Sequence, residues 1–455
     1  MHSTTTRKEA RSFRRYKPQV GSDAPVAPHS RKETAMRDET LCLHAGYTPG
    51  NTEPRVVPIV QSTTYTYDTT ADVAAVFDEP TKSLIYSRFA NPTVMAIEAK
   101  IAELEGGVGA MCTTSGQAAS LLSILNICQA GDSIVASAQI YGGTINLLSY
   151  TFKKLGIECI FVDPDASEEE ICAAIKPNTK AVFGETIANP ALSVLDIEKF
   201  ANAAHKNNIP LIVDNTFATP VLCKPFDFGA DIVIHSTSKY MDGHAVQVGG
   251  VIVDSGKFDW TNGKFPEFTE PDESYHGICY TETYGKAAYI IKARMQLMRD
   301  FGCYPAAHSA FLLNLGLETL AVRMKQYCEN ALTVAKYFQA SDKIDSVSYP
   351  GLEGDKYYEL AKKYLKGASG VISIVIKGGK ENAIKFMDSL KLASNEVHVA
   401  DIRTCVLHPA GETHRQLTEE QLAAAGINPG LVRFSVGLEN VEDIIADVEQ
   451  ALAQI

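Results

Sequence analysis

A lysine flanked by hydroxyl groups follows a run of apolar residues that is typical of a buried strand. The run covers 232–235, and Lys239 stands a few positions later, next to Ser238 and Tyr240. At the end of a buried strand a lysine amine is partly desolvated, which favours an amine that is neutral or covalently bound. Such an amine can form a Schiff base with a carbonyl group.

Two other segments deliver polar groups directly after predicted strands. The strand predicted at 211–213 is followed by Asp214, and the strand at 110–112 leads into 113–119, a turn of small residues that opens a helix. Free backbone N–H groups and the helix dipole at such a start suit a phosphate. Because ligands of open α/β sheets bind beyond the carboxyl ends of the strands, these segments are predicted to form one site.

A single cofactor explains the lysine, the aspartate and the turn together. Pyridoxal 5′-phosphate forms a Schiff base with a lysine, its pyridinium nitrogen pairs with an aspartate, and its phosphate binds at a helix start. We therefore predict that the chain uses pyridoxal 5′-phosphate through Lys239, Asp214 and the 113–119 turn. Taken alone, Asp214 could equally be a cap or turn residue, and the turn could be an ordinary capped helix start.

The elements that must position these groups alternate along the chain. Short apolar strands separated by helices indicate an α/β fold with a mostly parallel sheet covered on both faces. Strands are predicted at 110–112, 133–136, 158–162, 181–183, 211–213 and 232–235, and helices at 93–104, 144–154, 168–175 and 197–207. Residues 40–92 are predicted to be loop-like, and 256–285 to be a loop-rich insertion.

The domain prediction divides the chain into four parts. Residues 1–35 are rich in basic residues, proline and Ser/Thr, which predicts a disordered extension or a start called too early, with Met36 as the true start. An organelle-targeting segment is the second interpretation. Residues 36–93 are predicted to form an N-terminal arm and 94–295 the large cofactor-binding domain. Residues 296–455, with strands at 371–376 and 432–436, are predicted to form a smaller α+β domain.

Composition excludes several other classes of function. The chain has 455 residues with 42 basic and 54 acidic side chains and a net charge of −12, whereas nucleic-acid binders carry a basic face. No apolar run approaches the roughly 18 residues that span a bilayer. The 10 cysteines form no CxxC pair, which favours the reducing cytoplasm over a disulfide framework. Metal-ligand spacing is also missing among the histidines considered, which are His235, His244, His276, His408 and His414.

Several separated motifs resemble the Cys/Met-metabolism family of pyridoxal-phosphate enzymes, which have fold type I. The matching segments are 86–93, 141–144, 185–190, 231–244 and 432–437. They follow the order of the family from about Met36 to the C-terminus. The resemblance implies a large domain with a mostly parallel sheet of the seven-stranded type, covered by helices, plus a smaller α+β C-terminal domain.

The resemblance also implies a role for each matching residue. Lys239 carries the cofactor and then shuttles protons, Asp214 keeps the ring nitrogen protonated, and Tyr141 stacks on the ring. Asn189 binds the ring hydroxyl oxygen, and Arg433 clamps the substrate carboxylate with its bidentate fork. The remaining cofactor-binding positions are Ser115, Gly116, Gln117, Thr216, Ser236 and Ser238, together with Tyr86 and Arg88 from a neighbouring subunit. Asn189 and Tyr86 are also predicted to contact the substrate.

Simpler interpretations of some of these residues stay open. Lys239 and Arg88 could be surface charges, Tyr141 a core aromatic residue, and Arg433 one partner of an interdomain salt bridge. A site shared between subunits implies a homo-oligomer, and we predict a tetramer built of dimers. The expected partners are small-molecule substrates, with no nucleic acid, membrane or metal.

Within the family, the segments 258–277 and 299–302 are similar to those of O-acetylhomoserine sulfhydrylases. The likeness implies γ-replacement on O-acetyl-L-homoserine by sulfide or methanethiol, which gives homocysteine or methionine and acetate. Departures from the family pattern at 401–403 and 411–412 leave the acceptor and the leaving group open. Acetyl and succinyl leaving groups are therefore both compatible with the sequence.

Three other functions compete with this prediction. A methionine or cystathionine γ-lyase would use the same cofactor site, but lyases that process methionine usually carry a cysteine where this chain has Gly143. A cystathionine γ-synthase would accept cysteine, and the 258–277 insertion argues against it. A non-catalytic pyridoxal-phosphate-binding protein would not need Arg433 and Tyr141.

Overall fold

The computed structural model describes residues 36–78, 84–412 and 428–455. The larger of the two sheets, together with its covering helices, forms the first layer of the fold. This sheet has seven strands in the order β1-β7-β6-β5-β4-β2-β3. The strands are β1 (Gly109–Thr113), β2 (Ser133–Ser137), β3 (Glu158–Val162), β4 (Thr179–Glu185), β5 (Leu211–Asp214), β6 (Ile232–His235) and β7 (Gly250–Asp254). Strands β2 to β6 run parallel, and β7 is antiparallel to both of its neighbours, β1 and β6.

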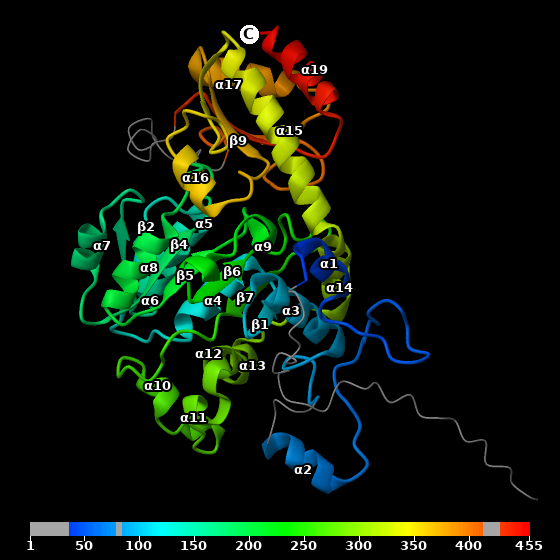
Figure 1. The fold of residues 1–455 in the computed structure, drawn as a ribbon, viewed down its shortest axis with the longest axis vertical. Helices are drawn as coiled ribbons and strands as arrows, with labels where there is room; N and C mark the ends of the chain where they lie inside the picture. Colours follow the sequence, from blue (N-terminus) through cyan, green and yellow to red (C-terminus); the bar gives the residue numbers. More distant parts are fainter. Residues whose placement is uncertain (1–35, 79–83, 413–427) are drawn as a thin grey trace, which may run out of the picture.

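Helices cover this sheet, and its strands are accordingly buried. All residues of β2 and β6 are buried, as expected for a sheet with both faces covered. The covering helices are α3 (Pro92–Glu105), α4 (Gly116–Leu125), α5 (Gly142–Asn146), α6 (Phe152–Lys154), α7 (Glu168–Ala174), α8 (Ile197–Lys206) and α9 (Thr219–Leu222) (Figure 1).

Local sequence signals set the ends of these helices. Helix α3 begins where the Asn91 side chain accepts a hydrogen bond from the Thr93 N–H, with Pro92 in the first helical position. It ends at Gly106, which adopts a left-handed conformation with φ of 79°. The resulting helix packs on β1 and places the 113–119 turn beyond the carboxyl end of that strand.

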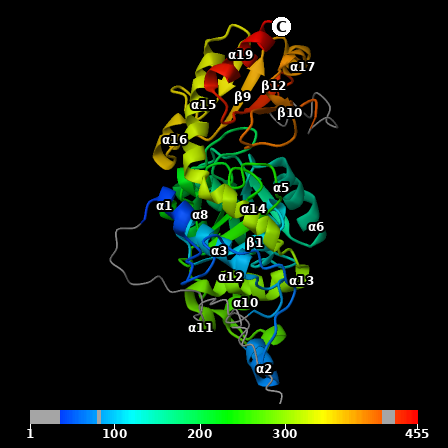
Figure 2. The same ribbon diagram turned by 90° about the vertical axis from the view of Figure 1, so that its right-hand side faces the viewer.

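A second sheet has the strand order β10-β11-β12-β9-β8. Its strands are β8 (Ile344–Ser348), β9 (Val371–Ile376), β10 (Ser394–Asn395), β11 (Cys405–Leu407) and β12 (Leu431–Ser435). Helices α16 (Tyr358–Tyr364), α17 (Gly379–Ser389) and α19 (Val441–Leu452) belong to the same part of the chain. The long helix α15 (Leu320–Ala340) follows α14 (Ala307–Glu318) and rises from the first layer to the second sheet (Figures 1 and 2).

A helical segment lies at the opposite end of the molecule from the second sheet (Figure 1). It contains α10 (Pro266–Thr269), α11 (Tyr280–Tyr284), α12 (Ala288–Lys292) and α13 (Arg299–Phe301). Trp260 is buried there and stacks on Phe268 and Tyr289, with ring centroids 4.6 and 5.1 Å away. The segment predicted as a loop-rich insertion is therefore partly helical and is held by an aromatic cluster.

The α/β fold class predicted from the sequence is confirmed, but several of the predicted elements are wrong or incomplete. Residues 40–92 are not uniformly loop-like, because they contain part of α1 (Asp38–His44) and all of α2 (Thr70–Asp78). Strand β7 was not predicted, because it is short, begins at the second of two adjacent glycines and is buried throughout, so that it shows no alternation of polar and apolar residues.

The predicted domain boundaries remain a proposal. The helical run 288–301 crosses the boundary placed between 295 and 296, and α14 packs on α3 of the first layer. The interpretation of residues 1–35 lies outside the described residues. In the part of the chain that the structure describes, no helix is both long and apolar enough to cross a membrane.

Candidate active site

The carboxyl ends of β4, β5 and β6 lie side by side at one edge of the first sheet. These neighbouring parallel strands end at Glu185, Asp214 and His235. Glu185 is opposite Asp214 in the strand register, and Lys239 follows His235 by four positions. The topology thus brings the predicted lysine and aspartate to the same sheet edge.

Asp214 is held by its own turn. The Thr216 backbone N–H donates to Asp214 Oδ1 at 3.0 Å, and the Thr216 hydroxyl donates to the same oxygen. The Thr216 hydroxyl oxygen also accepts a hydrogen bond of 2.8 Å from the Ser236 backbone N–H. Thr216 therefore fixes Asp214 and at the same time joins the end of β5 to the segment that carries Lys239.

Burial makes a negative charge costly at both acidic positions. It raises the pKa of Asp214 and raises the pKa of Glu185 well above its ordinary value, with the nearby Asp214 charge adding to the effect on Glu185. A buried carboxylate is stable when it has a cationic partner, and a pyridinium N–H is such a partner. Glu185 also accepts a hydrogen bond of 2.6 Å from the Tyr141 backbone N–H.

The start of α4 forms a close-fitting cradle. The Ser115 side chain caps the helix by accepting a hydrogen bond of 3.1 Å from the Ala118 N–H. A Cβ on Gly116 would lie only 2.6 Å from Ser236 Cβ, so this position must lack a side chain. Gln117 Oε1 is buried and has no hydrogen-bond partner among the described residues. A phosphate fits a helix start of this kind.

Lys239 carries an unusually acidic ammonium group. Burial, together with the positive charge of Arg433, lowers its pKa to about 8. Its Nζ lies 3.4 Å from Nδ1 of His398, which comes from the segment between β10 and β11. An amine with this pKa is neutral in a substantial fraction of molecules near pH 7 to 8, as a nucleophile or a base requires.

Arg433 reaches the site from β12 in the second sheet. Its Nη1 donates to Asn189 Oδ1 at 3.2 Å, and its Nη2 donates to the carbonyl oxygens of Val397 and His398 at 3.2 and 2.9 Å. Its Nε is buried with no partner among the described residues. The guanidinium is therefore fixed by both sheets and keeps donor capacity for a carboxylate.

Tyr141 and Gln117 lie close to one another across Gly143. A Cβ on Gly143 would be 2.4 Å from Tyr141 Cε1 and 2.6 Å from Gln117 Nε2. The Tyr141 side chain is 49% exposed, so it is not a core aromatic residue. This arrangement is compatible with a ring that stacks on a planar ligand.

Ser238 is engaged by its own loop. Its hydroxyl donates to the Gly249 carbonyl oxygen at 3.2 Å and accepts from the Gly249 N–H at 2.9 Å. The proposed contact of Ser238 with a phosphate therefore depends on a rearrangement of this hydroxyl or on its remaining lone pair.

Tyr86 and Arg88 do not join this group within one chain. Both line a separate cavity of about 340 Å³ whose walls include Gly302 and Tyr304. The Arg88 guanidinium donates to the Arg299 carbonyl oxygen and lies 5.4 Å from the centre of the Tyr86 ring. Their predicted role in the site of a neighbouring subunit stays a prediction.

Three of the histidines considered as metal ligands have other partners. His235 Nε2 lies 2.6 Å from Glu105 Oε1 in a fully buried pair, His244 contacts the Asp242 carbonyl oxygen, and His408 contacts that of Pro429. No group of three or more His, Cys, Asp or Glu residues is arranged to hold a metal ion within the described ranges. His414 lies outside them.

Two residues of the site were missed in the sequence. Glu185 was noted only as the start of a motif, although it follows closely on the strand predicted at 181–183, as Asp214 follows the strand predicted at 211–213. His398 stands outside every motif and is 159 residues from Lys239 in the sequence, so no local pattern could have indicated their contact.

The fold and the site together define the class of pyridoxal-phosphate-dependent enzymes with a lysine anchor. The half-buried lysine, the half-buried carboxyl group of Asp214 and the glycine cradle at the start of α4 fit that cofactor. Residues 39–453 match the family described as Cys/Met metabolism PLP-dependent enzymes, and the chain belongs to this family.

Curated relatives and solved structures cover nearly the whole chain. An O-acetyl-L-homoserine sulfhydrylase from Leptospira meyeri is 45% identical over 431 residues, which are 92% of this chain and 97% of that protein. A homocysteine synthase from Schizosaccharomyces pombe is 45% identical over 91% of this chain and 97% of its own length. A crystal structure of an O-acetylhomoserine (thiol)-lyase from Campylobacter jejuni, with N′-pyridoxyl-lysine-5′-monophosphate, has a TM-score of 0.88 and 37% identity over 92% of this chain and 100% of that chain.

Proposed function

We propose that this enzyme catalyses γ-replacement on O-acetyl-L-homoserine, with sulfide or methanethiol as the incoming group. The products are homocysteine or methionine, together with acetate. The observation that carries the proposal is the pairing of a low-pKa lysine at the edge of the first sheet with an arginine of the second sheet whose guanidinium is fixed by hydrogen bonds. The names of the relatives at 45% identity support the choice of substrate.

Arg433 binds and orients the substrate. Its buried guanidinium, held by Asn189, has an Nε–H group without a partner among the described residues, and this group is available to the α-carboxylate of the amino acid. Because β12 carries Arg433 and the loop after β6 carries Lys239, the carboxylate is held between the two sheets, with Cα near the lysine amine. Orientation of this kind lowers the entropic part of the barrier.

Lys239 moves the protons. When bound, pyridoxal phosphate supplies an electron sink beside Cα, which makes the Cα proton removable by an amine. Lys239 Nζ takes that proton and later returns one to the product, and its pKa of about 8 suits both tasks near neutral pH. Asp214 holds the proton on the ring nitrogen, and Thr216 keeps its carboxylate in place.

The other predicted site residues support the cofactor. Tyr141 stacks on the ring, and Asn189 binds its hydroxyl oxygen in addition to Arg433. The phosphate is bound by the start of α4 and the adjacent hydroxyls, which belong to Ser115, Gly116, Gln117, Thr216, Ser236 and Ser238. Tyr86 and Arg88 complete the active site of the partner subunit in a dimer. Two such dimers form a tetramer.

The reaction is proposed to take place in the cytoplasm. All ten cysteines are free thiols, which agrees with a reducing compartment. A thiol substrate such as sulfide or methanethiol would also remain reduced there.

A product assay tests the proposed activity directly. The purified protein, loaded with pyridoxal phosphate, is incubated with O-acetyl-L-homoserine and, separately, with sulfide, methanethiol or cysteine. The proposal expects homocysteine with sulfide or methionine with methanethiol, and stoichiometric acetate. Lys239→Ala serves as the control for uncatalysed replacement, which sulfide can support slowly.

Other products would assign another function. Release of 2-oxobutyrate and ammonia faster than any thioether or thiol product would establish a γ-lyase. Cystathionine as the main product with cysteine would establish a cystathionine γ-synthase. A coloured protein that forms none of these products from either the acetyl or the succinyl ester would indicate a binding protein.

A further inference from the structure

The imidazole of His398 is a titratable group beside Lys239 that the proposed mechanism does not use. Its Nδ1 lies 3.4 Å from Lys239 Nζ. Its Nε2 is buried and has no hydrogen-bond partner among the described residues. A buried polar nitrogen without a partner is costly, and this one belongs to a ring that already contacts the candidate base.

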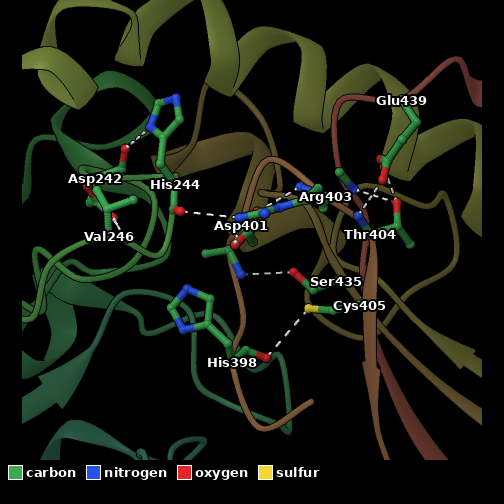
Figure 3. Close-up of polar contacts among 12 residues, drawn as sticks. Asp242, His244, Val246, His398, Asp401, Arg403, Thr404, Cys405, Ser435 and Glu439 are labelled. Carbon is green, nitrogen blue, oxygen red and sulfur yellow. Dashed lines mark hydrogen bonds and ion pairs between the residues drawn. The ribbon is translucent and has the colours of Figure 1, made fainter. Parts of the chain in front are cut away.

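The backbone on both sides of the ring is fixed. The His398 carbonyl oxygen accepts hydrogen bonds from Arg433 Nη2 at 2.9 Å and from the Cys405 thiol at 3.6 Å. Ala400 adopts a φ of 68° and donates its N–H to Ser435 Oγ at 2.9 Å. Figure 3 shows the ring directed away from Cys405, on the other side of its own backbone. The ring position is therefore set by the second sheet.

Charged side chains anchor the segment that follows. Arg403 donates to both carboxylate oxygens of Asp401, at 2.9 and 3.0 Å, and to the His244 carbonyl oxygen at 3.2 Å (Figure 3). Glu439 accepts hydrogen bonds from the Thr404 N–H and hydroxyl at 2.7 and 2.8 Å. The contact of Arg403 with His244 ties the segment between β10 and β11 to the loop after β6, which carries Lys239, and the contacts of Glu439 tie it to the chain after β12.

The surroundings keep the ring neutral. Burial and the positive charge of Lys239 lower the pKa of His398 to about 4. The charged groups that face the ring from its own segment, from β12 and from the loop after β6 are Lys239, Arg433, Arg403 and Asp401. Cations outnumber the one carboxylate, which disfavours a second proton on the imidazole.

The contact with Lys239 decides which nitrogen carries the single proton. After Lys239 has taken the Cα proton, its ammonium group can only donate, so Nδ1 of His398 must accept. A neutral imidazole that accepts at Nδ1 carries its proton at Nε2. At that stage the buried Nε2–H is a hydrogen-bond donor with no acceptor among the described residues.

We propose that His398 Nε2–H donates a hydrogen bond to the acyl oxygen of the departing group on the substrate. The inference rests on the proposed function and gives the site a preference for carboxylate esters of homoserine. Lys239 passes the Cα proton on to the bound cofactor, and its amine then takes a second proton from Cβ. The electron pair of that Cβ–H bond forms the Cβ=Cγ double bond, the Cγ–O bond breaks with its electron pair on the ester oxygen, and the carboxylate leaves as an anion. The proton on Nε2 stays on His398, so no further reactant is needed.

Two substitutions distinguish the roles of the two ring nitrogens of His398. In His398→Asn the amide oxygen occupies the place of Nδ1 and can still accept from Lys239, but nothing reaches the place of Nε2. In His398→Gln the amide nitrogen reaches the place of Nε2 and can donate to the leaving group. His44→Gln, at an exposed histidine on α1, is the matched control.

Two substrates separate leaving-group effects from general damage. O-Acetyl-L-homoserine releases a carboxylate, whereas L-2-amino-4-chlorobutanoate releases chloride, which has no directional acceptor. We expect His398→Asn to lower kcat/KM for the ester about 10- to 100-fold, as the loss of a hydrogen bond to a developing charge predicts. The same variant should react with the chloro compound within about threefold of the unsubstituted enzyme. His398→Gln should restore most of the preference for the ester.

Two readouts do not depend on turnover. Exchange of the Cα proton of L-2-aminobutyrate with deuterium, followed by NMR, reports proton transfer by Lys239 and should be unchanged in His398→Asn. The visible absorption of the bound cofactor, titrated with pH, should show that His398→Asn retains the cofactor with the spectrum of the unsubstituted enzyme.

The outcomes are distinguishable. Equal losses on the ester and the chloro compound, or a loss of Cα exchange, would overturn the leaving-group role of His398. No loss on either substrate would overturn it as well. If the unsubstituted enzyme processes the chloro compound but releases no acetate from O-acetyl-L-homoserine, the proposed function fails instead.

Discussion

Substitution of Gly116 by alanine should weaken the binding of pyridoxal phosphate without unfolding the chain. A methyl group at this position would lie 2.6 Å from Ser236 Cβ and 2.9 Å from Ser236 Cα, whereas ordinary contacts begin near 3.4 Å. The nearest obstacle includes backbone, which cannot rotate away as a long side chain does. The start of α4 and the segment after β6 must therefore move apart by most of an ångström.

The displacement falls on the groups proposed to bind the phosphate. Overpacking of a close contact costs about 1–3 kcal/mol. If most of this cost appears only when the cradle closes on its ligand, the dissociation constant should rise about 10- to 100-fold. The free energy of unfolding of the cofactor-free protein should change less, because the turn can relax when no phosphate fixes it.

Gly109→Ala is the matched control, since Gly109 begins β1 and its added methyl would meet only Ile290 Cγ2, at 3.1 Å. The cofactor is removed, and the protein is titrated with pyridoxal phosphate while the visible absorbance is recorded. A thermal unfolding curve of each cofactor-free variant accompanies the titration. If Gly116→Ala binds as tightly as Gly109→Ala, the start of α4 is not the phosphate cradle.

Three further predictions concern single side chains. Arg433→Lys should raise KM for the acyl amino acid about 10- to 100-fold, with a smaller change in kcat, because a single ammonium group replaces the bidentate guanidinium. An unchanged steady-state KM would show that Arg433 does not bind the substrate carboxylate. Glu105→Ala should lower the free energy of unfolding in urea by about 3–5 kcal/mol, since it leaves His235 buried without its partner; a loss under about 1 kcal/mol would contradict this. The hydrogen bond to Asp231 raises the pKa of His205 above 6.5, so its stabilisation is present below pH 6.5 and is lost as the pH rises through the folded pKa. The melting temperature of His205→Gln should therefore lie further below that of the unsubstituted protein at pH 6 than at pH 8. Because His205 is partly exposed, the difference in stabilisation between the two pH values should be less than about 1 kcal/mol. A larger loss at pH 8 than at pH 6 would refute the pairing.

The sequence was most informative where a chemically reactive side chain follows directly after a strand. Lys239 and Asp214 stand at the ends of β6 and β5, and parallel neighbouring strands bring such residues together. The start of α4 could be predicted for the same reason, because its serine cap and glycine are adjacent to the end of β1. In each case a local pattern and one general property of α/β sheets were sufficient.

Contacts between the two sheets could not be predicted in this way. Arg433 and Asn189 are 244 residues apart, and their contact depends on how the second sheet packs on the first. The same packing places His398 beside Lys239, although the segment that carries it contains only the short strand β10 and irregular backbone. Neither hydrophobic periodicity nor residue spacing encodes such a juxtaposition.

In the proposed mechanism, packing between the sheets also couples substrate binding to the basicity of Lys239. The pKa of its amine is lowered to about 8 by burial and by the positive charge of Arg433. A substrate carboxylate bound to Arg433 offsets that charge, so the amine becomes more basic when a substrate is in place. Burial also lowers the pKa of Arg433, and a bound carboxylate stabilises its charged form. The proposed base is therefore strongest when the proton that it would remove is nearby, because its basicity and the proposed carboxylate clamp depend on the same guanidinium.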